Sequence, residues 1–179
     1  MLKKLVSLVI VFVLCSSIFA MPVNYGDMTV QVESLIGTGS NQTMIVVDWE
    51  SGLTQSHAWL YQYNGTATVA DAFDALAAAC DFAWSQSAFV QYINYNDGLE
   101  SHATANLGWL SFWNKDSGGD WAMNNDGVYV QQLVNGSWSG AVADDFPNWG
   151  NAGPAIPTLP EPMTIVLFAI GAFITRRNK

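Results

Sequence analysis

The sequence predicts an α+β fold, in which a twisted and mainly antiparallel sheet packs against one helix. Several short segments alternate apolar and polar residues, as half-buried strands do. One alanine-rich stretch repeats its apolar residues at helical spacing, and clusters of Gly, Asn, Asp and Ser separate these segments. A single helix packed on a sheet is the simplest arrangement that buries the apolar face of each element.

Three strands are expected ahead of the helix. Residues 28–32 alternate apolar and polar side chains, which is typical of a strand with one buried face. Residues 43–49 contain an unbroken apolar run, which predicts a central strand covered on both faces. Residues 57–63 place His57, Trp59, Tyr61 and Tyr63 on one face and end at an Asn-Gly turn.

The helix is predicted over about residues 69–80. Thr68 is a suitable N-cap, and Asp71 lies where a negative charge is favoured by the helix dipole. One helical face is apolar and consists of Phe73, Leu76, Ala77 and Cys80. Cys80 is therefore expected to be a small core residue, although a lone thiol in an exported protein could also pair between molecules.

Beyond the helix, strands are expected at residues 88–95, 107–113 and 128–134. Residues 144–159 are rich in Pro and Gly and read as an extended linker. The sequence shows no internal repeat.

Both ends of the chain carry targeting signals. Residues 1–20 combine two lysines, an apolar stretch and a terminal Ala, which is typical of a signal peptide for export by the Sec machinery. Its removal leaves an exported globular domain at residues 21–143. Cys80 is then the only cysteine, so no intramolecular disulfide is expected.

The C-terminal segment, residues 160–179, joins a Pro-Glu-Pro triplet, an apolar run and a basic end. The apolar run at 163–175 has thirteen residues, and a helix of that length is about 20 Å long. Because a bilayer core is about 30 Å thick, this transmembrane segment is marginal. The basic end keeps the C-terminus cytoplasmic. A hydrophobic terminal core helix is the alternative, but it leaves the arginine pair unexplained.

These three parts, in this order, resemble the PEP-CTERM sorting signal of Gram-negative bacteria. The resemblance covers about the last 20 residues and implies recognition by an exosortase, with an inner-membrane intermediate before release to the cell envelope or the extracellular matrix. It implies a sorting motif of Pro160, Glu161, Pro162, Arg176 and Arg177. Proteins of this kind accompany exopolysaccharide systems.

The central domain resembles the β-grasp-like modules at the C-terminus of transcobalamin-type proteins. The similarity lies in the turn at residues 63–66 leading into the helix, and in Gly108-Trp109 to Trp113. It transfers no functional residue.

The charge distribution excludes one class of partner. Five of the six basic residues lie in the targeting segments, which leaves Lys115 in residues 21–159 against fourteen acidic residues. Such a surface repels nucleic acid.

Two kinds of binding site are candidates. The chain has eight tryptophans, and an exposed aromatic sheet face could stack on sugar rings. The residues expected to form this ligand site are Trp59, Tyr61, Tyr63, Trp109 and Trp113. The alternative is that these aromatics form the core. Asp116 and Asp120 could ligate calcium, or they could simply belong to a turn.

Catalytic signals are sparse. His57 and His102 are not in a metal-binding spacing, and the run Glu100-Ser101-His102 is expected to be a solvated loop because adjacent residues do not form a triad. No cofactor motif is present in the sequence. We therefore expect a non-enzymatic envelope or matrix protein that binds polysaccharide or a small ligand. The alternatives are a purely structural surface protein and, less favoured, a secreted hydrolase.

Overall fold

The structure is a computed structural model that describes residues 20–49, 56–87, 90–98, 100–104, 109–144, 150 and 152–158. The sorting segment and all but the last residue of the predicted signal peptide lie outside these ranges. No helix within the described ranges is both long and apolar enough to cross a membrane.

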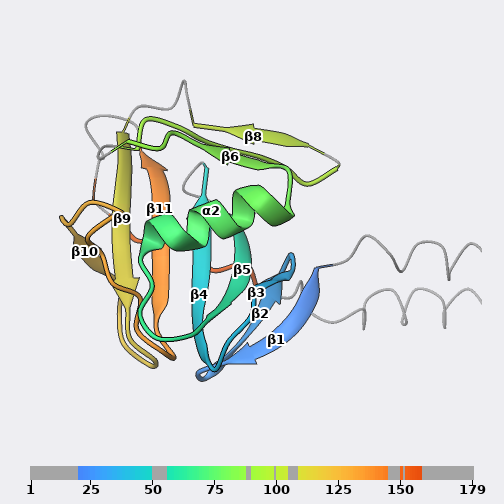
Figure 1. The fold of residues 1–179 in the computed structure, drawn as a ribbon, viewed down its shortest axis with the longest axis vertical. Coiled ribbons are helices and arrows are strands. Elements are labelled where there is room, and N and C mark those ends of the chain that lie inside the picture. Colours follow the sequence, from blue (N-terminus) through green and yellow to red (C-terminus); the bar gives the residue numbers. More distant parts are fainter. Residues whose placement is uncertain are drawn as a thin grey trace, which may run out of the picture.

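The described strands form three sheets (Figure 1). The largest has six strands, in the order β10 (Ala122–Asn124), β9 (Trp109–Lys115), β11 (Trp138–Asp144), β4 (Asn41–Asp48), β5 (Ser56–Tyr63) and β3 (Leu35–Gly37). A three-stranded sheet contains β6 (Phe82–Trp84), β7 (Ile93–Asn96) and β8 (Ser101–Ala103). A hairpin pairs β1 (Met21–Tyr25) with β2 (Met28–Val32).

The predicted α+β class is wrong, because 48% of the described residues lie in strands and only 9% in the helix. Much of the extra strand content comes from elements that the sequence pattern did not predict. Strands β3, β6, β8 and β10 have three residues each, which is too short to show a clear alternation. The membrane helix of that prediction, at residues 163–175, lies outside the described residues.

The six-stranded sheet is mixed. Strand β11 lies between β9, with which it pairs antiparallel, and β4, with which it pairs parallel. Strand β3 pairs parallel with β5, and β5 pairs antiparallel with β4. The central position of the sheet is thus occupied by a strand from near the end of the domain.

The strand predicted at residues 128–134 is also wrong. The carbonyl of Gly127 accepts hydrogen bonds from the amides of Val130 and Gln131, at 2.8 and 3.0 Å, and this folds the segment into a turn. Among the described residues, the strand-like pairing of this segment is limited to one isolated bridge between Gln132 and Thr68. Of the strand predicted at 88–95, only the end from Ile93 belongs to β7.

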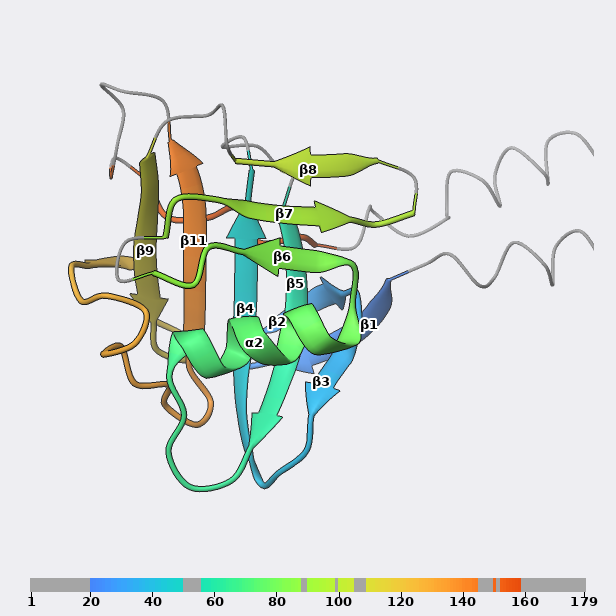
Figure 2. The same cartoon turned by 45° about the horizontal axis from the view of Figure 1, so that its top comes forward.

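Each face of the six-stranded sheet carries a separate layer. Helix α2 (Val69–Ala79) and the three-stranded sheet cover one face, and Figure 2 shows β6, β7 and β8 running across the long strands. The hairpin covers the other face, where Val30 and Val32 pack with residues of β4 and β5. Strand β4 supplies both cores by alternation, so the prediction of a central strand covered on both faces is confirmed.

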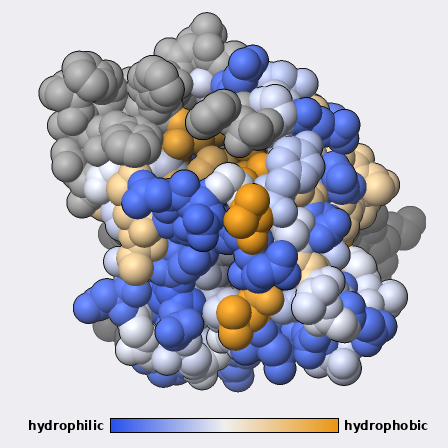
Figure 3. All heavy atoms as spheres, turned by 60° about the vertical axis from the view of Figure 1, so that its left-hand side comes forward, coloured by the Kyte–Doolittle hydropathy of each residue, from blue (hydrophilic) through white to orange (hydrophobic). Residues whose placement is uncertain are grey.

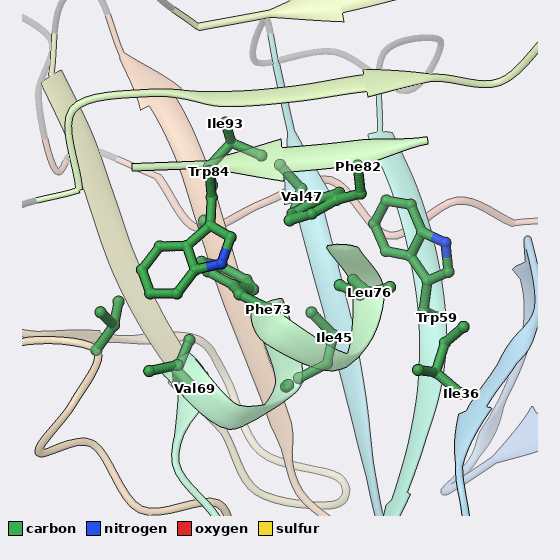
Figure 4. Close-up of a cluster of buried hydrophobic side chains, with 14 of the residues drawn as sticks. Ile36, Ile45, Val47, Trp59, Val69, Phe73, Leu76, Phe82, Trp84 and Ile93 are labelled. Carbon is green, nitrogen blue, oxygen red and sulfur yellow. The ribbon is translucent and has the colours of Figure 1, made fainter. Parts of the chain in front are cut away.

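The helix begins where the sequence predicts. The amide of Asp71 donates to Thr68 Oγ1 at 3.2 Å, and the amide of Thr68 donates to Asp71 Oδ2 at 2.7 Å, which completes a capping box. Phe73 and Leu76 are buried beneath the helix with Ile45 and Trp59 of the sheet (Figure 4). Cys80 ends the helix and is half-buried against this core.

Residues 152–158, which we call the C-terminal strap, pack back onto the domain. The carbonyl of Pro157 accepts from the amide of Gln31 at 2.9 Å, and Thr158 forms a bridge with Val30. Pro154 is buried against Gly140, where a Cβ atom would collide with the proline ring. This part of the predicted linker is therefore attached to the folded body.

Candidate functional site

A cluster of polar side chains lies at the beginning of β5. His57 is the second residue of β5 and lies opposite Val47 of β4. His102 is the middle residue of β8, opposite Tyr95 of β7. The three-stranded sheet crosses this part of the six-stranded sheet (Figure 2). This crossing brings together two histidines that are 45 residues apart in the sequence.

Two carboxylates complete the cluster. His57 Nε2 lies 3.2 Å from His102 Nε2. On its other side, His57 Nδ1 lies 2.8 Å from Glu33 Oε1, just beyond β2. His102 Nε2 lies 3.5 Å from Oδ2 of Asp97, which follows β7. We call these four residues the histidine centre.

The loop between β7 and β8 positions Asp97. Its Oδ1 accepts a hydrogen bond from the amide of Glu100 at 2.6 Å, and its own amide donates to the Glu100 carbonyl at 3.2 Å. These bonds leave Oδ2 directed at His102. The carboxylate is thus oriented by backbone contacts within its own turn.

The histidine centre is enclosed by aromatic rings and opens toward its carboxylates. His57 and His102 are only 8% and 6% exposed. The ring of Trp49 lies 5.5 Å from that of His57 and 5.4 Å from that of His102, and Tyr95 lies 5.2 Å from His57. The side chains of Glu33 and Asp97 are 25% and 18% exposed. Solvent therefore reaches the cluster from the carboxylate side.

The same enclosure affects Tyr95. Burial raises the pKa of its phenol well above the ordinary value, and the nearby charge of Glu33 raises the pKa further. The hydroxyl stays protonated at neutral pH. Tyr95 therefore adds no charge to the centre.

This arrangement can hold a cation. Among the residues that the structure describes, His57, Asp97 and His102 are the group of three ligand-type side chains whose donor atoms all lie within 4.8 Å of one another. Imidazole nitrogens and a carboxylate oxygen are common ligands of zinc and other transition metals.

The expected aromatic ligand site is not an open surface. Trp59, Tyr61 and Tyr63 do share a face of β5, but Trp59 is 0% exposed, and Tyr63 is also buried. Tyr61 is half-buried and stacks on Tyr63 with a centroid distance of 5.5 Å. Trp113 is buried as well, and the side chain of Trp109 lies outside the described residues. The layer that covers this face makes Trp59 and Tyr63 part of the core, whereas Trp113, opposite Gly140 of β11, lies on the other face of the sheet.

The proposed calcium ligands lie in an exposed turn after β9. The amide of Gly119 donates to the carbonyl of Asp116 at 3.0 Å, and both Asp116 and Asp120 are exposed. Within the described part of the chain, no third acidic, His or Cys side chain joins them in a metal-sized group. The sorting residues Pro160, Glu161, Pro162, Arg176 and Arg177 lie outside the described residues.

Sequence reasoning missed the histidine centre. The solvated loop expected at residues 100–102 is wrong at His102, which is buried in β8. A usable signal was present, since His57 shares the aromatic strand face for which a place in the core was the alternative, and a polar ring buried there needs a partner. His102 is the other histidine in the sequence.

Comparison with protein-family models, with curated proteins and with solved structures finds no match to this chain. The resemblances to PEP-CTERM signals and to β-grasp modules thus stay predictions. What the histidine centre does has to be argued from its own geometry.

Proposed function

We propose that this protein is an exported, non-enzymatic component of the cell envelope or extracellular matrix, sorted through its C-terminal segment. The observation that carries the proposal is the order of three parts at the chain end: the Pro-Glu-Pro triplet, the apolar run at 163–175 and the arginine pair. The partners on this proposal are the Sec export machinery and an exosortase-type sorting enzyme.

The attachment of the C-terminal strap is compatible with this role. Thr158 is bridged to Val30, and the amide of Ala155 donates to Asp48 Oδ2 at 2.9 Å. Pro160 follows two positions later in the sequence. The described chain therefore stays attached to the folded body as far as Thr158, two residues before the triplet in the sequence.

The domain surface also suits exposure to water. Figure 3 shows one face on which hydrophilic residues predominate and apolar residues form small, separate spots. Residues 21–159 contain Lys115 as their one Lys or Arg, against fourteen acidic residues. Such a charge favours a dispersed protein.

The burial of Trp59 and Tyr63 removes the support for polysaccharide stacking on that sheet face. A purely structural role for the domain is the second candidate. The histidine centre favours a ligand-binding role over it, because two buried rings and two carboxylates are not needed to fill a core.

The sorting proposal can be tested in a Gram-negative host that contains an exosortase. Deletion of Arg176 and Arg177, or the change Glu161→Gln, is expected to leave a larger, unprocessed form in the inner-membrane fraction. Fractionation and immunoblotting measure both size and location.

The matched controls are Lys115→Ala and Asp120→Asn, which remove the same kinds of charge from the domain. Both are expected to be processed and located as in the unmodified protein. Normal processing of the Arg176–Arg177 deletion would contradict the sorting proposal.

A further inference from the structure

We infer that His57, His102 and Asp97 bind a divalent transition metal ion, with zinc as the best fit, while Glu33 holds the ring of His57. This inference goes beyond the proposed delivery to the envelope and does not depend on it.

The distances between the donor atoms fit a single metal ion. Zinc binds histidine nitrogen at about 2.05 Å, so two such ligands at a tetrahedral angle lie about 3.3 Å apart. The two Nε2 atoms of His57 and His102 are 3.2 Å apart. His102 Nε2 and Asp97 Oδ2 are 3.5 Å apart. Both separations are close to edges of a tetrahedral coordination shell.

The contact with Glu33 fixes which nitrogen of the His57 ring carries a hydrogen. The ionised carboxylate of Glu33 can only accept, so the proton of their 2.8 Å contact belongs to His57 Nδ1. A neutral His57 ring then has a lone pair at Nε2, which faces His102. His57 Nε2 is therefore a hydrogen-bond acceptor at the point where the ring of His102 comes closest.

His102 cannot satisfy both of its neighbours. Its Nε2 faces an acceptor on His57 and an acceptor on Asp97, and a neutral ring has at most one hydrogen there. Two ring nitrogens and a carboxylate oxygen, each with a lone pair, thus lie within 4.8 Å of one another. A metal ion satisfies all three at once, because each can direct its lone pair at the ion.

Negative charge gathers at the histidine centre. Glu33 and Asp97 bring two carboxylates to a centre walled by aromatic rings. Lys115 is the one Lys or Arg between the targeting segments, and its Nζ lies 5.4 Å from the ring centroid of Trp138, in the core on the hairpin side. Lys115 is therefore occupied elsewhere, and a divalent cation would compensate the charge of these carboxylates.

The ligand types select the class of metal. Calcium and magnesium prefer shells made of oxygen, whereas imidazole suits zinc and its neighbours. Glu33 on the outer nitrogen of His57 reproduces the carboxylate–histidine–metal arrangement that orients metal-binding rings. Three protein ligands leave a fourth position, which a water molecule could reach from the partly exposed carboxylate side.

The test is a zinc titration of the full-length protein, purified in detergent and stripped of metal with a chelator. Isothermal titration calorimetry is expected to show one saturable zinc site per chain. Cobalt(II) in its place is expected to produce the strong visible absorption of a tetrahedral ion, which zinc then removes. Calcium is expected to produce no saturable binding at this centre.

Substitutions then locate the site. Glu33→Gln keeps the size of the side chain and is expected to weaken zinc binding by about 10- to 100-fold, as loss of an outer carboxylate does. His102→Gln removes one of the metal ligands and is expected to weaken zinc binding by more than about 100-fold. Asp116→Asn, a matched loss of a carboxylate in an exposed turn, is expected to leave zinc affinity unchanged.

The inference is overturned if the unmodified protein shows neither saturable zinc binding nor the cobalt spectrum, which would leave a hydrogen-bonded core cluster. It is equally overturned if Glu33→Gln binds zinc as tightly as both the Asp116→Asn control and the unmodified protein. Glu33 is partly exposed, so this variant is expected to fold even where His102→Gln does not. Circular dichroism checks the folding of each variant.

Discussion

Two different layers cover one face of the six-stranded sheet, and the side chains beneath the two layers differ in chemical character. Under helix α2, the side chains are apolar, as at Phe73, Leu76 and Ile45. Under β7 and β8, the same face of β5 presents His57 to His102. We call these the helix region and the histidine region. A single strand face thus changes from core to candidate binding centre according to the layer that covers it.

The difference follows from the covering elements. A helix presents an apolar stripe and satisfies its own backbone, so it adds packing and little else. The short strands β7 and β8 alternate their side chains, and the turn that joins them carries the acidic residues Asp97 and Glu100. The second arrangement can place His102 and Asp97 beside a buried ring, whereas the first cannot.

The largest effect is expected in the helix region. Phe73→Ala removes a fully buried ring and should lower the free energy of unfolding by about 3–5 kcal/mol. Urea denaturation followed by circular dichroism measures the loss. Val130→Ala, at an exposed position, should change the same quantity by less than about 0.5 kcal/mol. Comparable losses in both variants would contradict the assignment of Phe73 to the core.

The histidine region should show coupling between its two rings. In a double-mutant cycle of His57→Ala and His102→Ala, with a chelator present, we expect a coupling free energy of about 0.5–3 kcal/mol, because the rings are in contact. The same cycle between His102→Ala and Tyr25→Phe, on opposite faces of the sheet, should be additive within about 0.5 kcal/mol. Equal coupling in both cycles would remove the distinction between the layers.

The helix cap should matter to the helix region alone. Thr68→Ala removes the side-chain acceptor of the Asp71 amide and should lower the free energy of unfolding by about 1 kcal/mol. Zinc affinity should not change. Thr66→Ala, at an exposed position just before the cap, is the control and should be close to neutral. A loss of zinc affinity in Thr68→Ala would mean that the two regions are not separable.

At neutral pH, an effect on stability as small as that of Thr68→Ala is expected on the hairpin side. Tyr25 donates its hydroxyl to the carbonyls of Gln42 and Ser137, both at 2.9 Å. Tyr25→Phe should lower the free energy of unfolding by about 1 kcal/mol. Its pH dependence distinguishes it from the other variants.

Burial raises the pKa of Tyr25 from 10.0 to about 12. The folded protein therefore favours the neutral phenol, and this stabilisation is fully present below the ordinary pKa and is lost as the pH rises through the folded one. Urea midpoints should fall between about pH 9 and about pH 11.5 in the unmodified protein, and less in Tyr25→Phe. An identical fall in both proteins would show that Tyr25 ionises as it does in the unfolded chain.

Local signals account for the parts of the fold that the sequence predicts well. The apolar alternation of β2, the apolar run of β4 and the capping box of α2 each depend on neighbours within a few residues. Strand β11 gives no such signal, because Gly140, Ala141 and Ala143 are small and lack a marked pattern. Its place in the middle of the sheet is decided by pairing with β4 and β9, far away in the sequence.

The same division applies to function. The sequence by itself determined the predicted delivery of the protein, because charge, apolar length and proline position in the terminal segments act locally and need no fold. It also determined that the domain is acidic. Only the tertiary structure decided that Trp59 is buried beneath a covering layer and that His57 meets His102. A contact across 45 residues depends on which layer folds over which strand, and no local pattern encodes that choice.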